Sequence, residues 1–194
     1  MRAGKTLYSI FAAAILTLLF AATAVGQETL YDNGPDGDIG YYHVNFGSAV
    51  TNSFTLSQAA TLTGVVLTLY DVDDRNVPDR LKWTITTEPF GGDVKGTGFV
   101  ALNRLQAPYL TQFLFFAWKM GFPIPNLALP PGTYYLQIQD VVTYWDTWAF
   151  WAETAGGSST AYYEAIAQNG AGTITPVASE SFTVSGEWRE PQAQ

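Results

Sequence analysis

The chain has 194 residues, with 17 acidic and 9 basic side chains and a formal net charge of −8. Because phosphate binding needs clustered Lys or Arg, this charge argues against nucleic acid as a partner. The sequence has no cysteine and only one histidine. This composition excludes disulfides, thiol catalysis and any zinc or iron site built from several histidines.

The N-terminus has the features of a secretory signal peptide. Arg2 and Lys5 supply positive charge before the apolar run Leu7–Ala22, and small residues suited to cleavage follow in Ala22–Gly26. The alternative is an uncleaved membrane anchor, since the run is close to the roughly 20 residues that span a bilayer. The small residues favour cleavage, so we expect residues 1–26 to be removed. The mature protein would then be secreted, periplasmic or extracellular, more acidic still, and free of the membrane.

The rest of the chain predicts short β-strands separated by turns. Alternating or β-branched apolar residues indicate strands at Ile39–Phe46, Ser53–Leu56, Thr61–Tyr70, Leu81–Ile85, Lys95–Leu102, Gln112–Trp118, Tyr134–Ile138, Trp148–Glu153, Thr160–Ala165 and Ser181–Ser185. We expect a bulge at Gly64, where the inward-facing set of residues changes parity. Turn signals such as Pro130-Pro131-Gly132 fall between the strands.

This pattern predicts an all-β fold, a two-sheet antiparallel β-sandwich of jelly-roll-like type. A closed antiparallel barrel fits the same periodicity and is the alternative. We expect one sandwich domain over residues 27–188, followed by a polar tail over residues 189–194.

The chain resembles a family of exported bacterial β-sandwich proteins that has no established activity and often carries a PEP-CTERM sorting tail. The segments that carry the resemblance are YDNGP (Tyr31–Pro35), SFTLSQAATLTGV (Ser53–Val65), LKWTITTEPFGG (Leu81–Gly92), PGTYYLQIQD (Pro131–Asp140), FWAETAGGSSTA (Phe150–Ala161) and SESFTVSG (Ser179–Gly186). The resemblance implies the same sandwich fold and an exported protein.

Two departures from this family bear on function. The family has a Tyr-Trp-Asp-Glu-like run where this chain has Phe150-Trp151-Ala152-Glu153, so one acid is missing. Its sorting tail, Pro-Glu-Pro followed by an apolar helix and basic residues, is also missing, since Glu190-Pro191 leads only to polar residues. We therefore expect a released protein.

An acid-rich segment is a candidate calcium site. Four carboxylates and one amide fall within nine residues, at Asp71, Asp73, Asp74, Asn76 and Asp79, and hard cations require oxygen ligands at this density. The segment departs from the EF-hand pattern, because a basic residue, Arg75, stands among the ligands. The alternative is a solvated hairpin loop whose Asp and Asn side chains satisfy their own backbone. The acidic turn Asp32–Asp38 is a second candidate of the same kind.

An aromatic cluster is the main candidate for ligand binding. It consists of Tyr144, Trp145, Trp148, Phe150 and Trp151. Exposed aromatic faces could stack on sugar rings, with Asp146 and Glu153 as partners for hydroxyl groups. Strand alternation would instead place part of the cluster in the core. The predicted platform is Tyr144, Trp145 and Trp151, supported by the two acids.

Catalysis has weaker support in the sequence. A glycosidase needs two carboxylates flanking a cleft, and Asp146 and Glu153 are the available pair, seven residues apart. A serine hydrolase would have to use His43, but no Gly-x-Ser-x-Gly motif is present. We expect His43 to be a strand residue with a satisfied hydrogen bond, and the protein not to be an enzyme.

The segment Tyr109–Pro125 is the most apolar part of the chain after the signal peptide. We expect it to contain a buried strand that reaches solvent at Lys119, and the alternative is an exposed patch that binds a partner or touches a membrane. The apolar and aromatic character of the whole chain also favours self-association through one face or strand edge. The leading functional hypothesis is a non-enzymatic exported protein with an envelope, matrix or adhesion role. A carbohydrate-binding module comes second, and a glycoside hydrolase-like enzyme third. Polysaccharide or matrix polymers are the expected partners.

Overall fold

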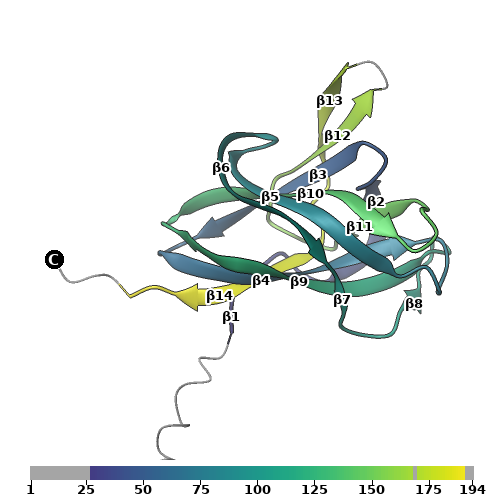
Figure 1. Ribbon diagram of the computed structural model, residues 1–194, viewed down its shortest axis with the longest axis horizontal. Helices are drawn as coiled ribbons and strands as arrows, with labels where there is room; N and C mark the ends of the chain where they lie inside the picture. The colour runs from purple at the N-terminus through teal and green to yellow at the C-terminus, as the bar shows by residue number, and fades with distance from the viewer. Residues whose placement is uncertain (1–26, 168–169, 191–194) are drawn as a thin grey trace, which may run out of the picture.

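The computed structural model describes residues 27–167 and 170–190 (Figure 1). The predicted signal peptide, residues 1–26, and residues 191–194 of the predicted tail lie outside the described residues. The described chain folds into strands: β1 (Glu28–Asp32), β2 (Asp36–His43), β3 (Ser48–Leu56), β4 (Ala60–Asp71), β5 (Pro78–Glu88), β6 (Gly91–Ala101), β7 (Asn103–Arg104), β8 (Tyr109–Leu110), β9 (Phe116–Leu129), β10 (Gly132–Thr143), β11 (Ala149–Thr154), β12 (Ala161–Ala167), β13 (Gly170–Val177) and β14 (Phe182–Trp188). Within these ranges, no helix has the length and apolar character needed to cross a membrane.

The strands form two antiparallel sheets. One has the order β1-β14-β4-β11-β2, with β9 pairing β4 along its length and β7 and β8 pairing β9. The other has the order β13-β12-β3-β10-β5-β6. The sheets lie over one another, and the β12–β13 hairpin projects beyond them (Figure 1). The predicted antiparallel β-sandwich is confirmed, and the sheets do not close into the alternative barrel. The chain passes repeatedly from one sheet to the other, as jelly-roll-like sandwiches do.

Strand alternation places the core as the sequence predicts. In β10, Tyr134, Leu136 and Ile138 are buried, while Gln137 and Gln139 on the opposite face are partly exposed. The alternate apolar residues of β5 are buried in the same way. These side chains meet those of β4 and β9 from the facing sheet in one apolar core.

The predicted bulge at Gly64 is confirmed. The pairing of β4 with β9 shifts between Leu62 and Gly64. Before the shift Leu62 faces the core, and after it Val65 and Leu67 do, so the inward set changes from even to odd residue numbers. The bulge lets one long strand keep an apolar face toward the core on both sides of the irregularity.

The prediction of a strand at Gln112–Trp118 is wrong in its first half. Strand β9 begins at Phe116, and the residues before it form a turn closed by the bond from the Thr111 N–H to the Phe115 carbonyl, 2.8 Å. This turn is rich in apolar residues because two of them pack against the outer face of the sheet that contains β4, β9 and β11. There Phe113 and Phe115 cover a second apolar cluster formed by Tyr70, Ala117, Phe150 and Ala152.

The second half of that apolar segment behaves as predicted. Trp118, Met120 and Phe122 of β9 are buried, and Lys119 between them is exposed. Leu110 and Leu114, ahead of the strand, are exposed. Self-association through one face or strand edge stays a prediction.

Candidate functional site

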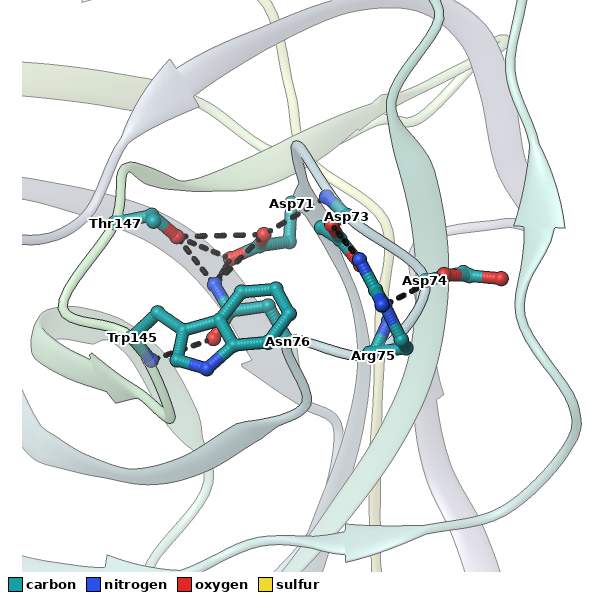
Figure 2. Close-up of polar contacts among 7 residues, drawn as sticks. All are labelled: Asp71, Asp73, Asp74, Arg75, Asn76, Trp145 and Thr147. Carbon is teal, nitrogen blue, oxygen red and sulfur yellow. Dashed lines mark hydrogen bonds and ion pairs between the residues drawn. The ribbon is translucent and has the colours of Figure 1, made fainter.

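The predicted calcium segment and the predicted aromatic cluster are neighbours. We call residues 144–148, between β10 and β11, the aromatic loop, and residues 72–77, between β4 and β5, the acidic loop. The backbone N–H of Trp145 donates to Asn76 Oδ1 at 2.8 Å, and Figure 2 shows this contact. The two sequence features therefore belong to one structural unit.

Asp71, the last residue of β4, holds the two loops together. Its carboxylate is fully buried and accepts hydrogen bonds from Asn76 Nδ2, 2.9 Å to each oxygen, and from Thr147 Oγ1 at 3.1 Å. Burial raises the pKa of Asp71, and the bonds from Asn76, Asp73 and Thr147 oppose that rise. Because Asn76 and Thr147 sit in the two loops, the Asp71 carboxylate ties both loops to the end of β4 (Figure 2).

The other acids of the predicted calcium site pair with arginines. Asp73 lies 3.2 Å from the Arg75 guanidinium, and Asp74 lies 3.8 Å from it. These contacts with Arg75 hold the pKa of Asp73 below its usual range. Asp79 lies 2.8 Å from Arg80. These three carboxylates thus turn toward arginines, and over residues 27–167 and 170–190 no three acidic or histidine side chains are grouped to hold a metal ion.

The second acidic turn is occupied by hydrogen bonds as well. The Asp36 carboxylate accepts from the hydroxyl groups of Tyr70 and Tyr109, and Asp38 Oδ2 accepts from the backbone N–H of Gln112 at 2.9 Å. Burial and the bond to Asp36 raise the pKa of Tyr70 and Tyr109. This turn therefore fastens the segment around β8 to the start of β2.

The aromatic loop exposes three large rings. The exposed fractions are 76% for Tyr144, 46% for Trp145 and 50% for Trp148. The rings of Tyr144 and Trp145 meet edge to face at 6.0 Å. The guanidinium of Arg75 lies 5.2 Å from the Trp145 ring centroid, within the range of a cation–π contact. The predicted platform residues Tyr144 and Trp145 are thus both at the surface, and Trp148 joins them on the loop.

His43 packs against rings. Its own ring lies 4.4 Å from those of Trp148 and Phe150, and burial lowers its pKa. The predicted hydrogen bond of His43 is not found among the described residues. The imidazole instead packs against the Trp148 ring. The ring of Phe46 also contacts Trp148, with 5.2 Å between the ring centroids.

Trp151 does not belong to the predicted platform. It is fully buried in the main core, and its indole N–H donates to the Ser181 carbonyl at 2.9 Å. The adjacent Phe150 is buried on the opposite face of β11, where it contacts Tyr41 and Phe115. Both faces of β11 are covered, so Trp151 cannot stack on a ligand.

Asp146 and Glu153 are not brought together. Asp146 lies exposed in the aromatic loop with a φ of 54°, whereas Glu153 lies near the other end of β11, against Gly40. A strand rises about 3.3 Å per residue, so the four steps from Ala149 to Glu153 alone span roughly 13 Å. Glycosidase carboxylates lie about 5–9.5 Å apart. The geometry therefore does not make this pair catalytic.

Glu180 is a buried acid that the sequence reasoning missed. Its side chain is fully buried and lies opposite Glu153 in an isolated β-bridge. Burial raises the pKa of Glu180 well above its usual range, and the charge of Glu153 raises it further. The only signal in the sequence is a polar triplet, Ser179 to Ser181, directly before a strand, and such a triplet is typical of an exposed turn.

A cavity beside the aromatic loop was also missed. It has a volume of about 480 Å³, and Tyr144 and three arginines, Arg75, Arg80 and Arg104, contribute to its wall. The arginines come from the acidic loop, β5 and β7. They are spread over 30 residues of sequence, so their spacing gives no indication that they share a site.

Comparison with known proteins finds no matching family model and no matching curated protein.

Proposed function

We propose that this chain is a non-enzymatic, exported β-sandwich that attaches to polysaccharide in the cell envelope or extracellular matrix through its aromatic loop. The observation that carries the proposal is the exposure of Tyr144, Trp145 and Trp148 on one loop of five residues. Folded proteins usually bury such side chains, and a group of exposed aromatics marks a contact surface. Their flat faces match the apolar faces of sugar rings.

The hydrogen bonds that hold the loop support the same proposal. Asn76 holds the Trp145 N–H, and the Thr143 hydroxyl accepts the Thr147 N–H at 2.9 Å. The fully buried Asp71 fixes Asn76 and Thr147 in turn. A loop that is ordered before it binds loses less conformational entropy on binding, so its aromatic contacts contribute more to affinity.

Two polar groups lie in position to help. Asp146 is exposed on the loop itself, and the Arg75 guanidinium lies against Trp145. Carboxylate and guanidinium groups accept from and donate to sugar hydroxyl groups. Glu153, predicted as the second acid, does not lie in the loop and has no part in the proposed site.

Calorimetric titration of the purified protein with a panel of soluble neutral and anionic polysaccharides tests the proposal. We expect binding to at least one polymer, and a loss of about two- to tenfold in affinity for Tyr144→Ala and for Trp145→Ala, since one stacked ring is worth about 0.5–1.5 kcal/mol and 1.4 kcal/mol is tenfold. Phe99→Ala is the matched control, because Phe99 is 55% exposed but lies on β6. The absence of binding to every polymer, or equal losses for all three variants, would overturn the proposal.

A further inference from the structure

The cavity beside Tyr144 concentrates positive charge in an acidic protein. Arg75, Arg80 and Arg104 line it, and they are three of only nine basic residues in a chain of net charge −8. One acid, Asp79, shares the wall. The lining therefore carries more positive than negative groups, in contrast to the chain as a whole.

The three arginines differ in how far they are already paired. Arg80 lies 2.8 Å from Asp79, and Arg75 lies 3.2 Å from Asp73. Arg104 has no carboxylate within ion-pair distance anywhere in the described part of the chain, and its guanidinium lies 5.9 Å from the centroid of the Trp118 ring. Arg104 is therefore the guanidinium group that an incoming anion meets without displacing an acid.

Most of the remaining wall is apolar. Val77, Pro78, Leu102 and Val142 line the cavity, together with the polar Thr143. Its volume of about 480 Å³ lies within the roughly 300–1,000 Å³ of small-molecule sites. An apolar wall, an aromatic ring and a planar cation within one cavity match a sugar ring that carries an oxyanion, because guanidinium groups bind carboxylate and sulfate through paired hydrogen bonds.

We propose that the polysaccharide bound by this protein is anionic, and that Arg104, with Arg80, holds its carboxylate or sulfate groups while Tyr144 contacts the same sugar chain. This inference rests on the proposed function, since it names the ligand class of the aromatic loop. The acidic remainder of the surface repels polyanions at long range. Binding of such a polymer therefore depends on the local arginines, and background binding is low.

The test compares three polymers on the same protein: polygalacturonate as a carboxylate, dextran sulfate as a sulfate, and dextran as the neutral reference. We expect polygalacturonate or dextran sulfate to bind at least about tenfold more tightly than dextran, and the stronger of the two identifies the oxyanion. Arg104→Gln should lower that affinity about tenfold and leave dextran unaffected. Arg104→Lys should restore part of it, since lysine keeps the charge but not the planar fork.

Arg189→Gln is the matched control, because it removes the same charge from an exposed residue after β14. Arg80→Gln serves as a second variant if the melting temperature shows that Arg104→Gln is unfolded. Equal affinity for dextran and the anionic polymers, or equal losses for Arg104→Gln and Arg189→Gln, would overturn this inference and leave the aromatic loop standing as a sugar platform. Equally tight binding of single-stranded DNA would overturn it too, since it would show general polyanion binding. Binding of none of the three polymers would overturn this inference, and the proposed function fails with it only if the wider panel of polysaccharides is not bound either.

Discussion

Asn52 and Glu180 join the two sheets through a pair of hydrogen bonds. Asn52, on β3, donates through Nδ2 to Glu180 Oε2 at 2.5 Å and accepts the Glu180 backbone N–H through Oδ1 at 3.2 Å. Glu180 lies just before β14 in the other sheet. Its second oxygen, Oε1, is buried and has no hydrogen-bond partner among the described residues. At the contact between the sheets, only one of the two oxygens of this fully buried carboxyl group therefore accepts a hydrogen bond.

This burial predicts that the free energy of unfolding depends on Glu180 and pH. Because the folded pKa of Glu180 is raised above the usual 4.5, the folded state holds a proton that the unfolded state has released. The favourable contribution is complete below about pH 4.5 and is lost as pH rises through the folded pKa. We expect Glu180→Gln to raise the free energy of unfolding at pH 8 by roughly 1–3 kcal/mol and to change it little at pH 4. Urea unfolding from pH 4 to 9 measures this difference.

Glu153→Gln separates the charge effect from burial. Glu153 is only partly exposed, and burial raises its pKa too. Its charge raises the pKa of Glu180, so removing that charge should give a smaller gain at pH 8 in the same direction. A Glu180→Gln protein that is less stable than the wild type at pH 8, or that keeps the wild-type slope with pH, would contradict the assignment.

Asn76 predicts a link between stability and the aromatic loop. Truncation by Asn76→Ala leaves the buried Asp71 carboxylate without its two bonds from Nδ2 and leaves the Trp145 N–H without its acceptor. Hydrogen bonds to charged groups contribute about 1.5–3 kcal/mol. We expect a loss of roughly 2–4 kcal/mol in urea unfolding and a weaker near-ultraviolet circular dichroism signal from the released tryptophan.

Asn103→Ala is the control for that change, because Asn103 is exposed on β7. It should alter the free energy of unfolding by less than about 0.5 kcal/mol. If Asn76→Ala behaved like Asn103→Ala, the network around Asp71 would not be what holds the aromatic loop.

Trp151 and Trp148 predict opposite outcomes from the same substitution. Trp151 is fully buried, whereas Trp148 is 50% exposed. Trp151→Ala should cost about 3–5 kcal/mol, since it leaves a large cavity in the core. Trp148→Ala should cost roughly 1 kcal/mol or less, through its lost contacts with His43 and Phe46. Thermal or urea unfolding of the two variants measures both, and similar losses would contradict the different placement of the two rings.

The sequence predicted well those features that depend on local alternation. The inward set of β10 and the parity change at Gly64 follow from the two-residue period of a strand, which is visible along the chain. Trp151 could not be placed, because its exposure depends on which segments cover each face of β11. Trp151 faces the main core between the sheets, and Phe150 on the outer face is covered by Phe113 and Phe115, some 35 residues earlier in the sequence.

The sequence predicted only part of the chemistry of the candidate site, for a similar reason. The composition of the acidic loop shows a density of oxygen atoms, but not their directions. The structure turns Asp71 inward to Asn76 and Thr147, and turns Asp73 outward to Arg75. Arg104 enters the site from another strand, and no local pattern marks it.

The directions of the Asp71 and Asp73 carboxylates also predict how the protein responds to calcium. A cation at the acidic loop would have to displace the donors on Asp71 or separate Asp73 from Arg75, whose guanidinium already neutralises it. Any ion that binds the folded state raises the melting temperature by mass action. We expect the melting temperature to be unchanged by excess EDTA and by excess calcium chloride. A rise with calcium that Asp73→Asn abolishes, and that Asp93→Asn on β6 does not, would instead place an ion at this loop. In that case the support of the aromatic loop would be metal-dependent, and sugar binding should weaken with EDTA in parallel.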